Sequence, residues 1–133
     1  MNYFAYGSNL SKKQMLERCP DSKPRFTATL HNYRLVFAGW SRKWRGGTAT
    51  IKSFRREKVP GAVYEISDND LRKLDNHEGY PDTNDRFNVI VNNEDDNPVE
   101  AVTYIRTGQI EETAPSKEYL AIMQQGYRDW RIV

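Results

Sequence analysis

The chain has 133 residues, with 20 Lys and Arg against 18 Asp and Glu, and a net charge of +2. This length predicts a single domain, residues 1–133, that can bury a core without disulfides or structural metals. The near balance of charge excludes a protein held to nucleic acid by bulk charge. The single cysteine, Cys19, excludes an intramolecular disulfide and favours a cytoplasmic location. We find no apolar run long enough for a membrane span and no secretory signal peptide, so no membrane partner is expected.

The N-terminal segment predicts a strand, a turn and a short helix. Residues 2–6 alternate around aromatic side chains and predict a strand that runs into the turn Gly7-Ser8-Asn9. Ser11 has Gln14 three residues later, a spacing typical of a capping box, which predicts a helix to about Arg18. The expected apolar face of this helix is formed by Met15, Leu16 and Cys19.

The remainder predicts more strands than helices. Strands are expected at 26–38, 48–51, 61–66, 87–91 and 101–105. The polar segment 92–98 makes the last two a hairpin, and Gly46-Gly47 breaks the chain before residue 48. Helices are expected to begin after Ser67 and Ser116. The face of the last helix would carry Tyr119, Leu120, Met123 and Tyr127. The pattern predicts a mixed α+β domain with a small, largely antiparallel, barrel-like sheet and a few short helices.

Glu78 is the first candidate for a catalytic residue. Leu71, Leu74 and Glu78 follow helical spacing and would share one face of the helix that starts after Ser67. A carboxylate at the end of an apolar stripe loses water, which raises its pKa toward the range of a general acid or base. The alternative is that the helix ends before residue 78 and leaves Glu78 solvated beside Gly79.

The segment Tyr6-Gly7-Ser8-Asn9-Leu10 is a candidate binding turn. A strand that passes through glycine into a helix N-terminus exposes backbone N–H groups, which can hold an anion or a developing oxyanion. The alternative is an ordinary turn in which glycine supplies a positive φ and asparagine a cap.

Residues 40–47 mix cations with aromatic side chains. Trp40 and Trp44 could stack on the bases of a single-stranded nucleic acid, with Arg42, Lys43 and Arg45 on its phosphates. Because the net charge is small, we favour a surface loop whose tryptophans pack down and whose cations stay in water. No nucleic-acid partner is expected.

The other reactive side chains form no pattern of a known site. His31 and His77 lie far apart, and no His, Cys and Asp spacing resembles a metal site. Cys19 has no nearby histidine and is interpreted as a small core residue.

Four segments of the chain resemble the γ-glutamylcyclotransferase-like family, which includes γ-glutamylamine cyclotransferases and avirulence-induced plant homologues. They are Tyr3-Phe4-Ala5-Tyr6-Gly7-Ser8-Asn9-Leu10, Gly46-Gly47-Thr48-Ala49-Thr50-Ile51, Leu74-Asp75-Asn76-His77-Glu78-Gly79-Tyr80 and Pro115-Ser116-Lys117-Glu118-Tyr119. The resemblance extends from Tyr3 to about Arg131.

The resemblance implies a barrel-like α+β fold and an enzyme that releases 5-oxoproline without a metal or cofactor. The α-amine of a γ-glutamyl group would attack its own γ-carbonyl, and an amine or amino acid would leave. The family's catalytic glutamate falls on Glu78. Its substrate-holding residues fall on Tyr6, Gly7, Ser8, Asn9, Leu10 and Tyr104. The expected partner is a small γ-glutamyl substrate, with the chain acting as a monomer or homodimer.

One position departs from the family pattern. Many members carry a tyrosine about six residues after the glutamate, where this chain has Asn84. The change affects the expected substrate specificity more than the chemistry. A second hypothesis, from another class, is a binding module that holds a γ-glutamyl or acidic ligand without turnover. The presence of Glu78 rather than Gln or Ala favours the enzyme.

Overall fold

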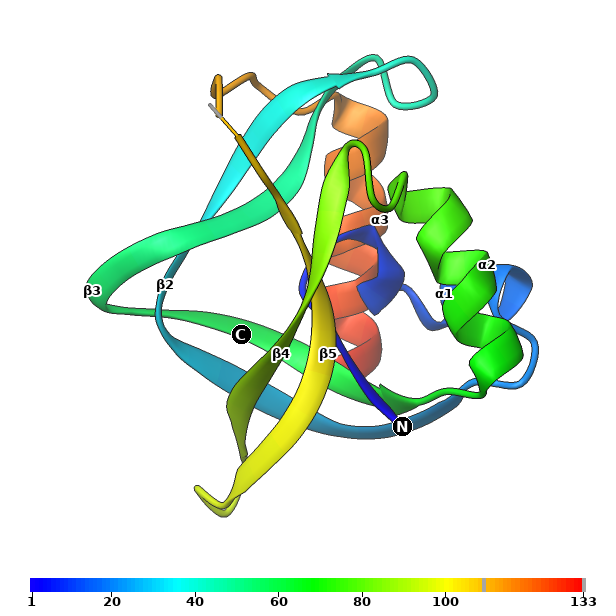
Figure 1. The fold of residues 1–133 in the computed structure, drawn as a ribbon, viewed down its shortest axis with the longest axis vertical. Helices are drawn as coiled ribbons and strands as arrows, with labels where there is room; N and C mark the ends of the chain where they lie inside the picture. The colour runs from blue at the N-terminus through cyan, green and yellow to red at the C-terminus, as the bar shows by residue number, and fades with distance from the viewer. Residues whose placement is uncertain (109, 133) are drawn as a thin grey trace.

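The computed structural model describes residues 1–108 and 110–132. Within this part, five strands close into a barrel in the order β1-β3-β2-β4-β5 (Figure 1). The strands are β1 Asn2–Ala5, β2 Lys23–Ser41, β3 Gly46–Glu65, β4 Asn84–Asn93 and β5 Pro98–Arg106. The helices are η1 Ser8–Leu10, α1 Lys12–Arg18, α2 Asp68–Glu78 and α3 Lys117–Trp130. The predicted α+β class with a barrel-like sheet is confirmed.

Strand β1 closes the barrel. It pairs antiparallel with β3, where Ala5 lies opposite Ala62, and parallel with β5, where Tyr3 lies opposite Val102. The pairing between β2 and β4 is short and consists of Ala28–Asn93 and Thr29–Asn92. The chain therefore leaves a strand that is paired on both edges directly into the turn at residues 6–10.

Strands β2 and β3 are longer than the sequence predicted. The expected strands at 48–51 and 61–66 are two parts of one continuous strand, β3. Their register shifts at Asn32, because His31 pairs with Lys58 and Tyr33 with Ser53. Asn32 has a φ of 66°, and its Oδ1 accepts a hydrogen bond from the Arg56 N–H at 3.2 Å. This irregularity bends the hairpin and accommodates the charged segment of β3 between Ser53 and Lys58, which lacks the alternation of a strand.

The predicted helix starts are confirmed. The hydroxyl oxygens of Ser11, Ser67 and Ser116 each accept the N–H of the residue three positions later. At Ser67 the capping box is complete. At Ser11 it is not, because the Gln14 side chain donates to Ser8 and Asn9 instead.

The predicted face of α1 is wrong at one position. Met15 and Cys19 are fully buried, whereas Leu16 is 58% exposed. Met15 and Cys19 lie four residues apart and point to the same side, and Leu16 lies one residue farther round the helix.

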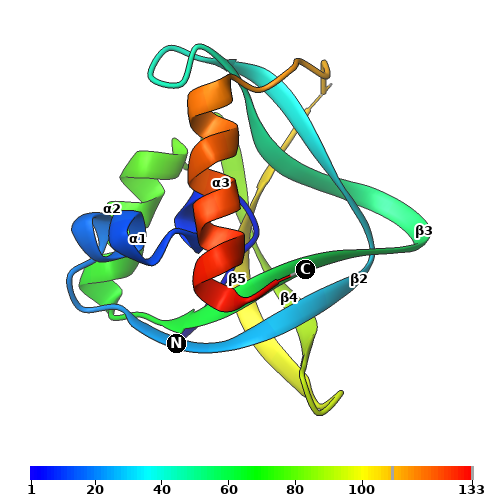
Figure 2. The same ribbon diagram turned by 180° about the vertical axis from the view of Figure 1, so that it is seen from behind.

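Helix α3 covers the turn after β1 (Figure 2). Tyr119 and Met123 are buried, as predicted, whereas Leu120 and Tyr127 are half-buried. At Gly126 a Cβ atom would lie 2.5 Å from the Leu10 Cβ and 2.7 Å from the Ser11 N. The helix thus approaches the turn so closely that no side chain fits between them. No helix in the described residues is long and apolar enough to cross a membrane.

Replacing Gly126 with Ala tests this contact. In an ordinary helix interior the change stabilises by about 1 kcal/mol. Here the added methyl group must displace α3 or η1, so we expect the free energy of unfolding to fall by about 1–3 kcal/mol. Urea denaturation measures the change. Gln124→Ala, at an exposed position of the same helix, is the control and should be close to neutral; a stabilised Gly126→Ala would disprove the close contact.

Candidate active site

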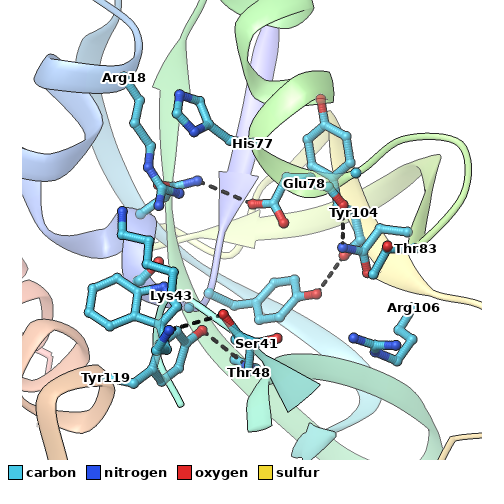
Figure 3. Close-up of a pocket in the computed structure, with 18 of the residues that line it drawn as sticks. Arg18, Ser41, Lys43, Thr48, His77, Glu78, Thr83, Tyr104, Arg106 and Tyr119 are labelled. Carbon is cyan, nitrogen blue, oxygen red and sulfur yellow. Dashed lines mark hydrogen bonds between the residues drawn. The ribbon is translucent and has the colours of Figure 1, made fainter. Parts of the chain in front are cut away.

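A cavity of about 360 Å³ opens where β1 ends, beside α2 and the turn between β2 and β3 (Figure 3). Its volume is in the range of small-molecule pockets. It is lined by Tyr3, Tyr6, Gly7, Ser8, Asn9, Arg18, Trp40, Ser41, Lys43, Trp44, Thr48, Ala49, Asn76, His77, Glu78, Gly79, Thr83, Asn84, Tyr104, Arg106 and Tyr119. Among the described residues, Glu78 is the sole carboxylate in this lining.

Glu78 is the last residue of α2. The helix continues to this residue, as the periodicity predicted, and ends at Gly79, which has a φ of 67°. Leu74 on the same face is fully buried. Burial raises the pKa of the Glu78 carboxyl above its ordinary value, and the charge of Arg18 opposes the rise. The direction of this shift agrees with the prediction from the helical spacing.

Asn9 connects the turn to Glu78. Its Nδ2 lies 3.4 Å from the Glu78 Oε1 and donates to the Tyr3 hydroxyl at 3.0 Å. Its Oδ1 accepts from Gln14 Nε2 and from Arg18 Nη1, each at 3.1 Å. Asn9 is 3% exposed, so the amide is held from both sides inside the protein.

Tyr104 lines the cavity, but its hydroxyl is engaged elsewhere. The hydroxyl donates to Asp75 Oδ1 at 2.6 Å, and the same oxygen lies 3.2 Å from Arg86 Nε. The Tyr104 carbonyl accepts from the Tyr6 hydroxyl. Burial and the neighbouring Asp75 raise the pKa of Tyr104. Tyr104 thus stays protonated and fastens β5 to both α2 and the end of β1.

Leu10 is the one expected binding residue that the structure places outside the cavity. Its side chain is fully buried, and its N–H donates to the Gly7 carbonyl. Its own carbonyl accepts from Trp130 Nε1 at 2.9 Å. Leu10 is therefore a core residue, and its amide is already paired. The other expected site residues, which do border the cavity, are Tyr6, Gly7, Ser8, Asn9, Glu78 and Tyr104.

The turn between β2 and β3 was predicted to be a surface loop, but it also borders the cavity. Trp44 packs edge-on against Tyr119, with ring centroids 5.3 Å apart, and Lys43 lies over the Trp44 ring. Trp40 does not pack down as predicted, because it is 65% exposed. The Tyr119 hydroxyl accepts from the Ala49 N–H at 3.0 Å, and burial raises the pKa of Tyr119 to about 12. The mixture of aromatic and basic residues in this turn was therefore a signal in the sequence for a part of the cavity wall.

Sequence reasoning missed the cations of the cavity. Arg18, Lys43 and Arg106 come from three separate parts of the chain, and Figure 3 shows Arg18 and Lys43 to the left of Glu78 and Arg106 to its right. None of the three forms an ion pair among the described residues. Arg18 and Arg106 gave no signal in the sequence, because nothing local marks them as neighbours.

Asn84, the position that departs from the family pattern, has a structural role here. Its Nδ2 donates to the Glu78 carbonyl at 2.7 Å. This bond pairs a carbonyl at the C-terminal end of α2 that has no partner within the helix. The amide therefore helps to hold the residue that presents the carboxylate.

Of the other reactive side chains, His77 lines the cavity and Cys19 does not. Cys19 is buried, its thiol donates to the Asp70 carbonyl at 3.6 Å, and burial raises the pKa of this thiol to about 12. In the part of the chain that the structure describes, no three His, Cys, Asp or Glu side chains gather as metal ligands would.

Comparisons with known proteins identify the family. A family model described as gamma-glutamyl cyclotransferase, AIG2-like, matches residues 3–130. The chain is 30% identical to the gamma-glutamylcyclotransferase of Homo sapiens over 134 residues, which covers 96% of this chain and 70% of the relative. It is 27% identical to the Mus musculus protein of the same name over 132 residues, with the same coverage of 96% and 70%. A solved gamma-glutamyl cyclotransferase superposes with a TM-score of 0.95 at 28% identity, covering 99% of this chain and 80% of that one.

The chain therefore belongs to the gamma-glutamyl cyclotransferase, AIG2-like family. It is an enzyme of the γ-glutamylcyclotransferase-like class, as the sequence predicted.

Two substitutions in the turn test how it forms the cavity wall. Gly7 has a φ of −113°, so it is not needed for a positive φ. A Cβ atom there would lie 3.0 Å from the Tyr119 hydroxyl and 3.2 Å from the Ala49 Cβ. We expect Gly7→Val to reduce kcat/KM at least about 100-fold, since a displacement of about 1 Å can cost that much.

Ser8→Ala is the matched change at the next residue. It removes one acceptor of Gln14 Nε2, which keeps its bond to Asn9. We expect a loss of no more than about tenfold, near the net value of one hydrogen bond, about 0.5–1.5 kcal/mol. Circular dichroism confirms folding of both variants; equal, small losses would show that the turn is not a shaped wall.

Proposed function

We propose that this chain is a γ-glutamyl cyclotransferase in which Glu78 acts as general base and then general acid. The observation that carries the proposal is the position of Glu78, the sole carboxylate lining the cavity among the described residues. Its pKa is raised by burial, which suits proton transfer near neutral pH. The turn at Gly7, Ser8 and Asn9 forms the adjacent wall.

The reaction needs one proton carrier. The α-amine nitrogen of the γ-glutamyl group attacks the γ-carbonyl carbon, and Glu78 takes the proton that this nitrogen loses. When the tetrahedral species collapses, the bond from carbon to the leaving nitrogen breaks and Glu78 returns the proton to that nitrogen. The products are 5-oxoproline and a free amine or amino acid. One carboxylate completes the cycle, because the proton taken in the first step is the one returned in the second.

Binding need only fold the substrate, because its nucleophile and electrophile are tethered. In favourable intramolecular reactions such proximity contributes about 7–11 kcal/mol. A cavity of about 360 Å³ can hold the γ-glutamyl group of the substrate in a bent conformation. No enzyme nucleophile is required, which agrees with the position of Cys19 outside the set of residues that line the cavity.

The cations of the cavity indicate the charge of the substrate. Arg18 is engaged by Asn9, whereas Lys43 and Arg106 have no carboxylate partner among the described residues. The γ-glutamyl group brings one carboxylate. The second free cation favours a leaving group that carries a carboxylate of its own. The substrate would then be a γ-glutamyl amino acid rather than a γ-glutamylamine.

Glu78→Gln tests the catalytic role. The amide keeps the volume but cannot carry the proton, so we expect kcat to fall by about 10²–10⁴-fold while substrate still binds. Because loss of solvent raises the pKa of this half-buried carboxyl, its ionised form opposes folding at neutral pH. The variant should therefore be as stable as the wild type or slightly more stable.

The measurements are 5-oxoproline release, calorimetric binding and thermal unfolding. Glu17→Gln, at an exposed position of α1 outside the cavity lining, is the control and should keep activity within about twofold. If Glu78→Gln released 5-oxoproline at nearly the wild-type rate, the assignment of Glu78 would fall.

A matched pair of substrates tests the charge of the leaving group. γ-Glutamylalanine and γ-glutamylethylamine differ only by the carboxylate of the leaving group. We expect kcat/KM to be at least about tenfold higher for the alanine compound, since a charge-assisted hydrogen bond contributes about 1.5–3 kcal/mol. Lys43→Met should reduce this preference. Equal kcat/KM values for the two compounds would contradict the assignment of the leaving group.

A further inference from the structure

Helix α1 contacts the Glu78 carboxylate through Asn9. Gln14 and Arg18 lie four residues apart on one face of α1, and both donate to the Asn9 Oδ1 at 3.1 Å. On the other side of the amide, Nδ2 faces the Glu78 Oε1 at 3.4 Å and the Tyr3 hydroxyl at 3.0 Å. The chain thus places a cation, an amide and a carboxylate in a row that ends in the cavity.

The chemistry of the two ends allows only one orientation of this amide. A guanidinium can only donate hydrogen bonds, so the oxygen of Asn9 must face Arg18. An ionised carboxylate can only accept them, so the NH₂ group must face Glu78. Gln14 strengthens this choice, because its Nε2 also donates to the Asn9 oxygen. Reversal of the amide would break three hydrogen bonds at once.

The charged and titratable groups around Glu78 single out Arg18. Across the cavity lining these are Tyr3 of β1, Tyr6 directly after β1, Arg18 of α1, Lys43 of the β2–β3 turn, His77 of α2, Tyr104 and Arg106 of β5, and Tyr119 of α3. Burial raises the pKa values of the four tyrosines, so they are neutral near pH 7. Of the cations, Arg18 is the one whose charge lowers the pKa of Glu78.

We propose that Arg18 is a positioning residue for Glu78: through Asn9 it fixes the carboxylate in the cavity and stabilises its ionised form, with Gln14 as second anchor of the amide. Arg18 is not expected to touch the reacting atoms. A carboxylate that must accept a proton from the substrate amine needs to be ionised beforehand, and burial works against that state. The hydrogen bonds from Arg18 through Asn9 to Glu78 restore part of the stability that burial removes from the ionised carboxylate.

The inference rests on the proposed function only for its kinetic readout, so the test has a second readout that needs no activity. The side-chain carboxyl of Glu78 is followed by ¹³C NMR from pH 4 to 9, and its signal is identified by its loss in Glu78→Gln. The proteins are the wild type, Arg18→Met, Arg18→Lys and Gln14→Leu. Lys13→Met removes one charge from an exposed position of the same helix and is the matched control.

In Arg18→Met we expect the titration midpoint of Glu78 to rise by at least about one pH unit, the lower end of what a nearby opposite charge contributes. The acid limb of kcat/KM should move to higher pH by the same amount, because activity needs the ionised carboxylate. Gln14→Leu should shift both in the same direction by less, although it changes no charge. The midpoint of Arg18→Lys should lie between those of Arg18→Met and the wild type. The midpoint of Lys13→Met should equal that of the wild type.

A wild-type midpoint in Arg18→Met would overturn the inference, as would an equal shift in Lys13→Met, which would indicate long-range charge alone. An unshifted Gln14→Leu would remove the role of the amide. Should Arg18→Met fail to fold, Gln14→Leu and Arg18→Lys still decide the matter. If the wild type released no 5-oxoproline while the midpoints shifted as expected, the proposed function would fall and the positioning role would stand.

Discussion

The cavity depends on the double pairing of β1, which bonds to β3 on one edge and to β5 on the other. A strand held on both edges cannot slide, so the turn that follows it starts from a fixed point. Helix α3 then presses on that turn at Gly126, where only a hydrogen atom fits against Leu10. The wall that carries Gly7, Ser8 and Asn9 is therefore held by contacts of β1 and α3 that do not involve a substrate, which suits a reaction limited by orientation.

Against this wall the fold places a carboxylate where a charge is unfavourable. Glu78 ends α2, so it lies at the negative end of the helix dipole, and it is half-buried in the wall of the cavity. Both effects disfavour the ionised form. The opposing contributions come from outside the helix, as the charge of Arg18 and the amide of Asn9. The pKa of Glu78 reflects this balance, and its direction is compatible with the proton transfers that we propose for this residue.

The hydroxyl groups of the cavity belong mainly to the scaffold. Tyr104 donates to Asp75, Tyr6 donates to the Tyr104 carbonyl, and Tyr119 accepts from Ala49. These bonds join strands and helices that meet only at the cavity. Arg18, Lys43 and Arg106 form no ion pair among the described residues, which is why the charge of the substrate is the property we expect this cavity to select.

Sequence alone determined the features that rest on neighbours a few residues apart. The serine caps depend on a hydroxyl and an N–H three positions on, and the direction of Glu78 depends on helical spacing from Leu74. Only the tertiary structure decided that Arg18 and Arg106 meet at one cavity and that Leu10 leaves it. Those outcomes depend on the register of β1 with β5 and on the closeness of α3, contacts between residues about a hundred positions apart in the chain. Local sequence patterns do not predict such contacts, because the contacts form only when the barrel closes.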